Sequence, residues 1–586
     1  MNPVNPVNSG SSGSSGNGGG VVRTAFAAAG PAPGADADPI TTEIVRQGLN
    51  AAADHMKRAL TRTAFSPIIY EALDFAVAFY DTDMCMLAQA PTLPAFMGTL
   101  GFCVRAAVEG VGGPGSLAPG DVILYNDPYG TGSHPQDAAM VVPVFAGGEL
   151  TAYSVIKAHW LDIGGKDPYS TDTLDVYQEG TIFPGVKLYD AGRLVGDIYR
   201  MILANSRMAD MVIGDINAMV AGARAGGEAL AAIVDRYGKA EFTACVARMY
   251  AHGEALVRDW FAALPDGVYT ASGAIDSDGV SGVPVPFSVK VTVEGTRIEV
   301  DLTDCPDQTP GPINCPLPST VAACRLAVAF LAGAGEQPNE GHFRPLDVLT
   351  RPGSLFHPRR PAPCFMYGIP ADHAIELVLA ALAEAVPDVP AASGGDINAL
   401  VWWGEREATG TPWTDGAPHP VGQGASPRGD GAGALMYLSQ SATRLTPAEV
   451  WEARNPWRIE RMALAEDSGG PGTHRGGPGL DLSFRCLEDH YLTSALARTR
   501  TAPWGRAGGH AGRPGGLTVE HPDGTVEEHA LRTRIPLAKD AVVHLRTGSG
   551  GGFGPPSGRD PQAVQADLRE GYITEEHARR HYPHAL

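Results

Sequence analysis

The feature that most constrains the fold is a pair of apolar runs joined by two glycines. Residues 138–145 and 151–159 are rich in Val, Ile, Tyr or Phe, and Gly147-Gly148 lies between them. Such runs around a Gly-Gly pair predict an antiparallel β-hairpin. If the turn is centred on the two glycines, the residue numbers of each cross-strand pair add up to about 295 or 296. Asp137 is therefore expected opposite Ala158 or His159. Cβ atoms of directly opposed residues lie about 5 Å apart.

This hairpin brings ligand-type residues together. His134 lies three residues before Asp137 and can fold over from the preceding loop, while His159 ends the second run. Two imidazoles and a carboxylate with open positions suit a catalytic zinc, manganese or iron ion, which can polarise a carbonyl or supply hydroxide. A His-x-x-Asp spacing alone is also common on protein surfaces. The convergence of His159 on the same point is therefore what favours a metal site.

Other candidate sites carry weaker signals. Asp74 precedes the apolar run 75–79, which would bury it, so it is either a fourth metal ligand or an aspartate of a cap or turn. The glycines at 164–165 and 550–554 could hold an anion through their amides. No phosphate-loop motif surrounds the first pair, and a chain with 73 glycines makes ordinary turns and loops the expectation for both. The sequence also lacks a serine-hydrolase elbow and a dinucleotide fingerprint opening a helix.

The remaining patterns predict an α+β fold of mixed and antiparallel sheets with helical segments. Apolar residues recur at helical spacing from Pro39 to about residue 60, and a long helical stretch from 198 to 250 is interrupted at 236–238. Strands are expected over 269–275 and 287–302, helices near 321–333 and 373–386, and a β-rich, loop-laced region from residue 391 onward.

Composition excludes several classes of protein. The formal net charge of −21 repels phosphate backbones and anionic membrane surfaces, so neither nucleic acid nor membrane is an expected partner. Eight cysteines in 586 residues are too few for a disulfide framework, and we expect them to be reduced and mostly structural. Residues 1–38, rich in Asn, Gly, Ser and Pro, predict a disordered tail and not a secretory signal, which makes a cytoplasmic location the default.

From about residue 41 to 573 the sequence resembles the hydantoinase B/oxoprolinase family. This family includes the beta subunits of ATP-dependent hydantoinases and caprolactamase, the C-terminal half of 5-oxoprolinase, and components of acetone and acetophenone carboxylases. The signatures here are Asn126-Asp127-Pro128-Tyr129 with His134 and Asp137, Ala158-His159 with Asp162-Ile163-Gly164-Gly165, Gln178-Glu179-Gly180, Pro184 to Tyr189, Ala204 to Arg207, Gly214 to Asn217, Asp467 to Gly472 with Arg475-Gly476-Gly477, and Gly551 to Gly554.

The resemblance implies one large unit spanning 39–573, followed by a short C-terminal tail over 574–586. The changes of pattern along the chain predict soft internal boundaries near 265 and 390. The resemblance also implies a divalent metal held by Asp74, His134, Asp137 and His159, of which the last three are the candidate catalytic residues. Finally, it implies a hetero-oligomer with a hydantoinase A-type subunit that binds ATP and Mg²⁺ and phosphorylates the substrate oxygen. We hypothesise that Asp162 orients a ligand imidazole.

One departure from the family concerns the substrate. Many members carry the motif His-Ile-Pro-Val-His-Leu-Gly where this chain has residues 92–98, with Thr92 and Phe96 in place of the two histidines. Roles attached to those histidines therefore do not transfer. An apolar wall from Phe96 and Met97 would favour a bulkier or more hydrophobic substrate.

Three functions remain open from the sequence. The first is hydrolysis of a cyclic amide such as a hydantoin, lactam or oxoproline, in which this chain is the metal-containing subunit. The second is carboxylation of a ketone by an enzyme of the acetone or acetophenone carboxylase type. The third is a scaffold that only positions its partner. Both enzymatic functions would use the same metal ligands, so the metal-site residues do not distinguish between them.

Overall fold

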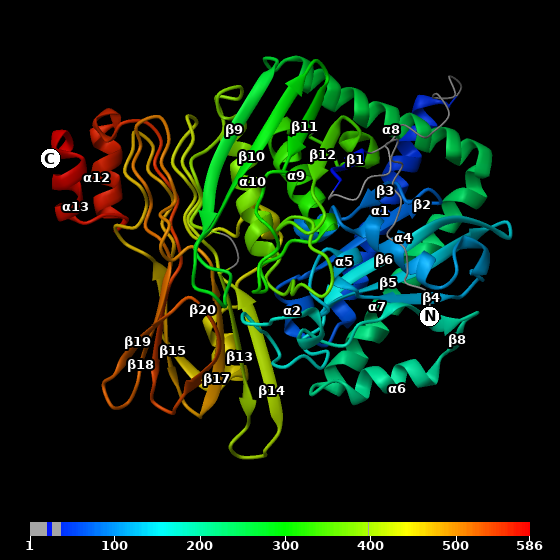
Figure 1. Ribbon diagram of the computed structural model, residues 1–586, viewed down its shortest axis with the longest axis horizontal. Helices are drawn as coiled ribbons and strands as arrows, with labels where there is room; N and C mark the ends of the chain where they lie inside the picture. The colour runs from blue at the N-terminus through cyan, green and yellow to red at the C-terminus, as the bar shows by residue number, and fades with distance from the viewer. Residues whose placement is uncertain (1–19, 26–36, 334, 396–397) are drawn as a thin grey trace.

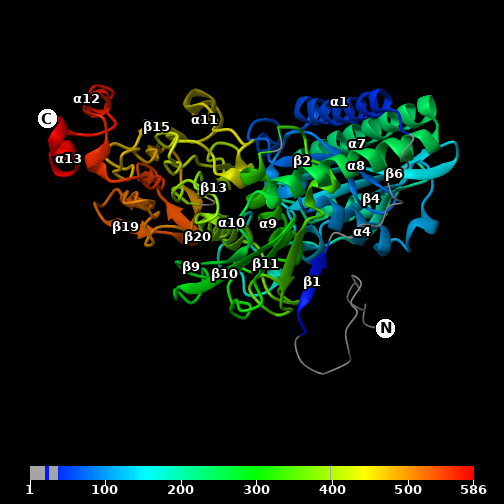
Figure 2. The same cartoon turned by 90° about the horizontal axis from the view of Figure 1, so that it is seen from above.

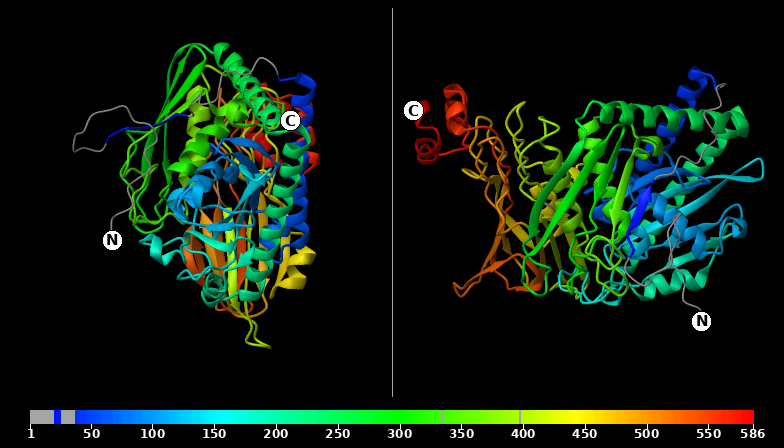
Figure 3. Two further views of the ribbon diagram at one scale, coloured as in Figure 1. Left: turned by 90° about the vertical axis from the view of Figure 1, so that its right-hand side faces the viewer. Right: turned by 45° about the horizontal axis from the view of Figure 1, so that its top comes forward.

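Four β-sheets and the helices that cover them form an elongated molecule (Figure 1). The computed structural model describes residues 20–25, 37–333, 335–395 and 398–586, apart from the side chain of Met97. The helices α1 and α8 lie at one end, and the last strands and helices lie at the other (Figure 3). The predicted α+β class with mixed and antiparallel sheets is confirmed.

The first sheet has seven antiparallel strands in the order β3-β2-β6-β5-β4-β7-β8. Its centre is the predicted hairpin, β5 (Asp137–Ala146) and β6 (Glu149–His159). The other strands are β2 (Phe75–Asp81), β3 (Met86–Gln89), β4 (Val122–Tyr125), β7 (Pro184–Asp190) and β8 (Arg193–Leu194).

The hairpin register places Asp137 directly opposite His159, which is one of the two predicted partners. Gly147 and Gly148 have φ values of 58° and 85°, which a tight two-residue hairpin turn requires and which glycine adopts without strain. A β-bulge between Val144 and Phe145 shifts the pairing by one residue. Without this bulge Asp137 would face Ala158, so the bulge brings the two ligand-type side chains side by side.

Each face of this sheet has its own apolar core. Helices α1 (Pro39–Thr63) and α7 (Ala209–Tyr237) pack on one face, and α4 (Leu100–Gly110) packs on the other (Figure 2). The predicted interruption of the long helical stretch is the break at Gly238 between α7 and α8 (Lys239–Ala262). Shorter helices accompany the sheet, namely α2 (Pro67–Tyr70), α3 (Pro94–Met97), α5 (Pro128–Thr131) and α6 (Gly196–Ala204).

The second sheet has the order β1-β12-β11-β10-β9 and packs on helices α9 (Leu317–Ala332) and α10 (Gly368–Leu382). Its strands are β9 (Gly267–Ile275), β10 (Val285–Glu294), β11 (Arg297–Asp301), β12 (Leu346–Thr350) and β1 (Val22–Ala25). Strand β1 corrects the prediction of a disordered tail for its own residues, because it pairs antiparallel with β12 and Arg23 forms ion pairs with Glu299 and Asp347. The rest of the predicted tail, except residues 20–21 and 37–38, lies outside the described residues.

Two further sheets form the last third of the chain. One has the order β14-β13-β17-β20, with β13 (Asn398–Glu405), β14 (Pro412–Pro418), β17 (His490–Leu496) and β20 (Leu531–Leu537). The other has the order β15-β16-β21-β18-β19, with β15 (Trp457–Leu464), β16 (Leu480–Cys486), β18 (Gly516–Glu520), β19 (Val526–His529) and β21 (Val542–Arg546). They share a core of tryptophans and aliphatic side chains, and α11 (Ala448–Arg454) packs beside β15.

The glycine-rich segments between these sheets and the C-terminus are not loose loops. Extended chain segments around residues 391–395, 422–425, 469–479, 505–512 and 548–554 hydrogen-bond to one another through their backbones. A Cβ atom on Gly548 would lie 1.7 Å from the carbonyl oxygen of Gly394, and one on Gly550 would lie 1.8 Å from that of Gln423. We call these segments the glycine bundle. Backbones this close leave room only for glycine, as at the axis of collagen.

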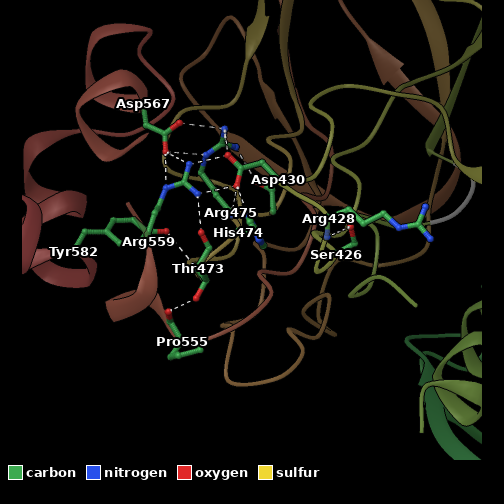
Figure 4. Close-up of polar contacts among 12 residues, drawn as sticks. Ser426, Arg428, Asp430, Thr473, His474, Arg475, Pro555, Arg559, Asp567 and Tyr582 are labelled. Atoms are coloured by element: carbon green, nitrogen blue, oxygen red, sulfur yellow. Dashed lines mark hydrogen bonds and ion pairs between the residues drawn. The ribbon is translucent and has the colours of Figure 1, made fainter. Parts of the chain in front are cut away.

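An ion network anchors the C-terminal helices to the glycine bundle (Figure 4). Arg559 donates to both oxygens of Asp430 at 2.7 Å and to Asp567 at 2.7 Å, and Arg475 bridges to Asp567 at 3.3 Å. Because each buried charge meets opposite charges, the network needs no ligand.

Ordered structure continues past the predicted boundary at residue 573 into the predicted C-terminal tail. Helices α12 (Pro561–Arg569) and α13 (Glu575–His581) share one small core formed by Val564, Ile573, Ala578, Tyr582 and Ala585. The apolar face of α13 is therefore buried, which the short and highly charged sequence of this segment did not indicate.

The glycine bundle yields a stability prediction. Gly548→Ala should lower the free energy of unfolding by on the order of 3 kcal/mol, because the added methyl group meets a backbone carbonyl that cannot rotate away. Gly516→Ala is the matched control, since nothing lies within 4 Å of its Cβ position. Thermal unfolding of the full chain checks this; equal midpoints for the two variants would contradict the packing.

Candidate metal centre and adjoining cavity

Three predicted ligands meet at one buried point. The Nδ1 atom of His159 lies 2.9 Å from Oδ1 of Asp137, and Nε2 of His134 lies 3.2 Å from the same oxygen. The two imidazole nitrogens are 3.0 Å apart. Among the described residues this is the one group of three His, Cys, Asp or Glu side chains whose ligand-type atoms all lie within 4.8 Å of one another.

The fourth predicted ligand, Asp74, lies at the edge of this group. It precedes β2, its carbonyl oxygen accepts a hydrogen bond from the amide of His159 at 3.2 Å, and its side chain lines the same cavity. It is not one of the three residues whose ligand atoms cluster. Its assignment as a ligand therefore stays a prediction.

A backbone carbonyl fixes the orientation of His134. Its Nδ1–H donates to the carbonyl oxygen of Phe365 at 2.9 Å, because a carbonyl can only accept. In the neutral imidazole the Nε2 lone pair then faces Asp137. The hypothesis that Asp162 orients a ligand imidazole is wrong, since its carboxylate binds the backbone amide and guanidinium of Arg207 instead.

The electrostatics of the cluster suit a cation. Burial alone would raise the pKa of Asp137, but the charges and hydrogen bonds of His134 and His159 outweigh burial and hold it below its ordinary value. Burial raises the pKa of Asp74 to about 7, and the neighbouring charge of Asp137 contributes to the increase. A metal ion would favour the ionised form of both carboxyl groups.

Two orphaned oxygens support the fit of a metal. Oδ1 of Asp74 and Oδ2 of Asp137 are buried and find no hydrogen-bond partner within the described part of the chain. Buried carboxylate oxygens without donors are costly unless a cation compensates them. Together with the lone pair of His134, they give the oxygen and nitrogen donor set that zinc, manganese and iron bind. The residues present therefore fit a divalent ion.

A mostly apolar cavity of about 100 Å³ opens from the cluster. Its lining comes from three distant parts of the chain: the first sheet with its loops, helices α9 and α10, and strands β13 and β14. Phe96 and Leu161 lie among the apolar side chains, and Tyr169 and Tyr367 line it close to His134. The site can exist only where these parts of the chain pack together.

Phe96 is buried against a lysine. The Nζ atom of Lys157 lies 4.1 Å from the centre of the Phe96 ring and donates to the carbonyl oxygen of Thr131 at 3.0 Å. The phenyl face thus compensates part of a fully buried ammonium charge. The side chain of Met97, the other half of the expected apolar wall, lies outside the described set.

Glu179 connects the metal loop to the opposite wall. Its Oε1 accepts hydrogen bonds from the amides of Cys364 and Phe365 at 2.7 and 2.9 Å, and its carbonyl accepts one from Gln136. Sequence reasoning recognised Glu179 only as part of a signature. Cys364 and Phe365 lie 185 and 186 positions away in the chain, so no local pattern could reveal the connection.

The glycines at 164–165 and 550–554 lie in backbone-packed segments. Gly164 has a φ of 77° and packs against the carbonyl of Asn205, as expected for a turn. The amides of Gly550, Gly551 and Gly552 donate to backbone carbonyls inside the glycine bundle, so they are not available to an anion. All eight cysteines are free, and all except Cys85 are buried.

We predict that His134→Ala and His159→Ala each weaken the binding of Mn²⁺ or Zn²⁺ by more than about 100-fold, because loss of a ligand exceeds the 10–100-fold effect of losing its supporting partner. His252→Ala, at a side chain that is 58% exposed, is the control. Elemental analysis and chelator competition on the purified chain measure the affinity. Metal binding equal to wild type in both variants would refute the site.

The buried carboxyl group of Glu179 is expected to make the free energy of unfolding depend on pH. Burial raises its pKa to about 8, against hydrogen bonds that favour the carboxylate. Between the ordinary pKa of a glutamate and 8, the folded chain keeps a proton that the unfolded chain has lost. Stability should therefore fall with rising pH in this window, by up to about 1.4 kcal/mol per pH unit.

In Glu179→Gln this contribution should vanish, so urea unfolding midpoints at pH 5 and pH 8 should differ less than in the wild type. Glu575→Gln, at an exposed site, should leave the wild-type dependence unchanged. Parallel pH curves for wild type and Glu179→Gln would show that Glu179 does not hold the proton.

The described part of the chain contains no helix with the length and apolar character that crossing a bilayer requires.

Comparison with known proteins gives matches over almost the whole chain. It is 31% identical to the B component of a D-/L-hydantoinase of Pseudomonas sp. (strain NS671), covering 92% of this chain and 94% of the relative. It is also 31% identical to the beta subunit of the caprolactamase of Pseudomonas jessenii, covering 93% and 96%.

Two solved structures share the fold. The crystal structure of the ATP-dependent caprolactamase from Pseudomonas jessenii matches with a TM-score of 0.86 at 29% identity, covering 93% of this chain and 96% of that chain. A nucleotide-free acetone carboxylase matches with a TM-score of 0.82 at 18% identity, covering 93% and 79%, which shows the fold alone. The family model for hydantoinase B/oxoprolinase matches residues 38–556, and the chain therefore belongs to the hydantoinase B/oxoprolinase family.

Proposed function

We propose that this chain is the metal-containing subunit of an ATP-dependent hydrolase that opens cyclic amides. The observation that carries the proposal is the buried group of His134, Asp137 and His159, which opens into a mostly apolar cavity. The similarity to the B component of a hydantoinase and to the beta subunit of a caprolactamase, over nearly the full length, supports the substrate class.

The reaction has a clear atom balance. Water adds its oxygen to the carbonyl carbon, the C–N bond breaks with its electron pair passing to nitrogen, and the nitrogen takes up a proton. Amide resonance makes the carbonyl carbon a poor electrophile and so opposes this addition. Phosphorylation of the carbonyl oxygen by a partner would weaken that resonance. A second water then releases inorganic phosphate. The products are an open-chain amino acid, ADP and phosphate.

Each residue of the site has a defined task. His134, Asp137 and His159 would hold the ion, with Asp74 as a fourth ligand. A divalent ion at this position supplies Lewis acidity near neutral pH. The carbonyl of Phe365 keeps Nε2 of His134 free, and the apolar walls exclude bulk water from the reacting carbon.

The proposal includes a partner. The chain has no phosphate-loop motif, so ATP and Mg²⁺ are expected on a hydantoinase A-type subunit in a hetero-oligomer. Phosphoryl transfer and ring opening would then occur on different chains. The free cysteines agree with a reducing compartment, and we propose the cytoplasm.

Ketone carboxylation is the second candidate, favoured by the shared fold with acetone carboxylase. The discriminating experiment incubates this chain and its A-type partner with ATP, Mg²⁺ and one of two substrate sets. Ring-opened amino acid from hydantoin, 5-oxoproline or caprolactam supports hydrolysis, whereas incorporation of labelled bicarbonate into acetone or acetophenone supports carboxylation. If neither product forms and elemental analysis finds no divalent metal, the scaffold hypothesis replaces both.

Because Phe96 lines the cavity, we expect the enzyme to prefer cyclic amides with apolar rings. Phe96→His should lower kcat/KM for caprolactam by about tenfold relative to 5-oxoproline, because a polar ring replaces the phenyl face in the cavity and beside Lys157. Phe96→Leu, which keeps the wall apolar, serves as the control. An unchanged ratio of kcat/KM values in Phe96→His would exclude Phe96 as a determinant of ring preference.

A further inference from the structure

Two tyrosines stand beside the metal ligands without a task in the chemistry described above. The rings of Tyr169 and Tyr367 lie edge-on to His134, with centroids 6.0 and 5.6 Å from its ring. Both side chains line the cavity, and each is 8% exposed. They come from distant parts of the chain, because Tyr169 lies between β6 and β7 and Tyr367 immediately precedes α10.

Neither hydroxyl has a hydrogen-bond partner among the residues that the structure describes. Within residues 37–333, 335–395 and 398–586, Tyr169 and Tyr367 donate no hydrogen bond through their hydroxyls. By contrast, the hydroxyls of Tyr129 and Tyr250 donate to Ala362 and Asp81. A buried tyrosine ordinarily finds a partner for its hydroxyl. Two unused donors that line one cavity indicate that their partner is a bound molecule.

The carboxyl groups of Asp74 and Asp137 lie near both tyrosines. Both phenols lie within electrostatic range of Asp74 and Asp137, and Tyr169 lies within range of Tyr367. A phenol next to carboxylates stays neutral near pH 7 and donates its proton in a hydrogen bond. The hydroxyls can therefore donate to an oxygen atom of a molecule bound in the cavity.

We propose that Tyr169 and Tyr367 are catalytic residues that donate hydrogen bonds to the oxygen atoms on the reacting carbon of the substrate. This inference rests on the proposed function, in which the oxygen of the attacking water and the phosphorylated carbonyl oxygen share the reacting carbon once water has added. Preorganised donors aimed at such oxygens act in a cavity that excludes bulk water, where each is worth far more than in solution. The cavity lining is mostly apolar, so the two hydroxyls are among the few polar groups that could contact the substrate head.

The test uses Tyr169→Phe, Tyr367→Phe and the double variant, with Tyr153→Phe as the matched control. The hydroxyl of Tyr153 is also without a partner, but it is sealed in the core away from the cavity. In the assembled complex with ATP and caprolactam, each cavity variant should lose about 100-fold in kcat with KM changed less than about threefold. Metal content should stay at the wild-type value in all four variants.

A binding measurement separates this inference from the proposed function. A seven-membered cyclic phosphonamidate imitates the tetrahedral adduct through its two phosphoryl oxygens. Calorimetry on the full chain loaded with Mn²⁺ should show binding that is at least about tenfold weaker in each cavity variant and unchanged in Tyr153→Phe.

The outcomes are distinct. If the binding pattern holds but the wild type opens no cyclic amide, the proposed function fails and the assignment of the tyrosines stands. If the wild type turns over caprolactam and the cavity variants match its kcat, the tyrosines are not catalytic residues. A wild-type chain that does not bind the phosphonamidate, or variants that bind it equally well, would also overturn the assignment.

Discussion

The carboxylate of Asp137 is the charge around which the first sheet and its neighbours are arranged. It is fully buried, and the two imidazoles that share its oxygen come from the loop before β5 and from the end of β6. Because an unpaired buried carboxylate is costly, the sheet must deliver both histidines to it. On the opposite wall of the cavity, the carbonyl oxygen of Phe365 accepts a hydrogen bond from His134 and so fixes the orientation of its imidazole.

Sequence reasoning reached the parts of this site that depend on local pattern. The hairpin is predictable because its strands are adjacent in the chain, and turn geometry limits the partner of Asp137 to Ala158 or His159; the bulge between Val144 and Phe145 selects His159. The roles of Phe365 and Tyr367 could not be predicted, since they depend on packing between segments more than 200 residues apart. Asp162 was assigned to an imidazole because it follows His159, yet the structure gives it a nearby arginine that no spacing rule indicated.

The last third shows a different limit of prediction. Its high glycine content indicated turns and loops, and the β-strands there were expected, but the glycine bundle was not. Segments that pack through their backbones need no alternation of apolar and polar side chains. The hydrophobic periodicity that identifies helices and strands is therefore absent from the glycine bundle. The reason for the glycines is steric, and it becomes visible only when the carbonyl of Gly394 is found beside Gly548. The four-residue ion network then fastens α12 and α13 to this rigid unit.

The bulge in the hairpin makes the site sensitive to chain length. Between the turn and the metal loop, β6 carries one residue more than β5, which is what aligns Asp137 with His159. Any evolutionary insertion or deletion of a single residue on that side would exchange the inner and outer faces of one strand. Relatives of this chain can therefore vary freely in the turn, but length changes in the stretch from the bulge to His159 should occur only as compensating pairs.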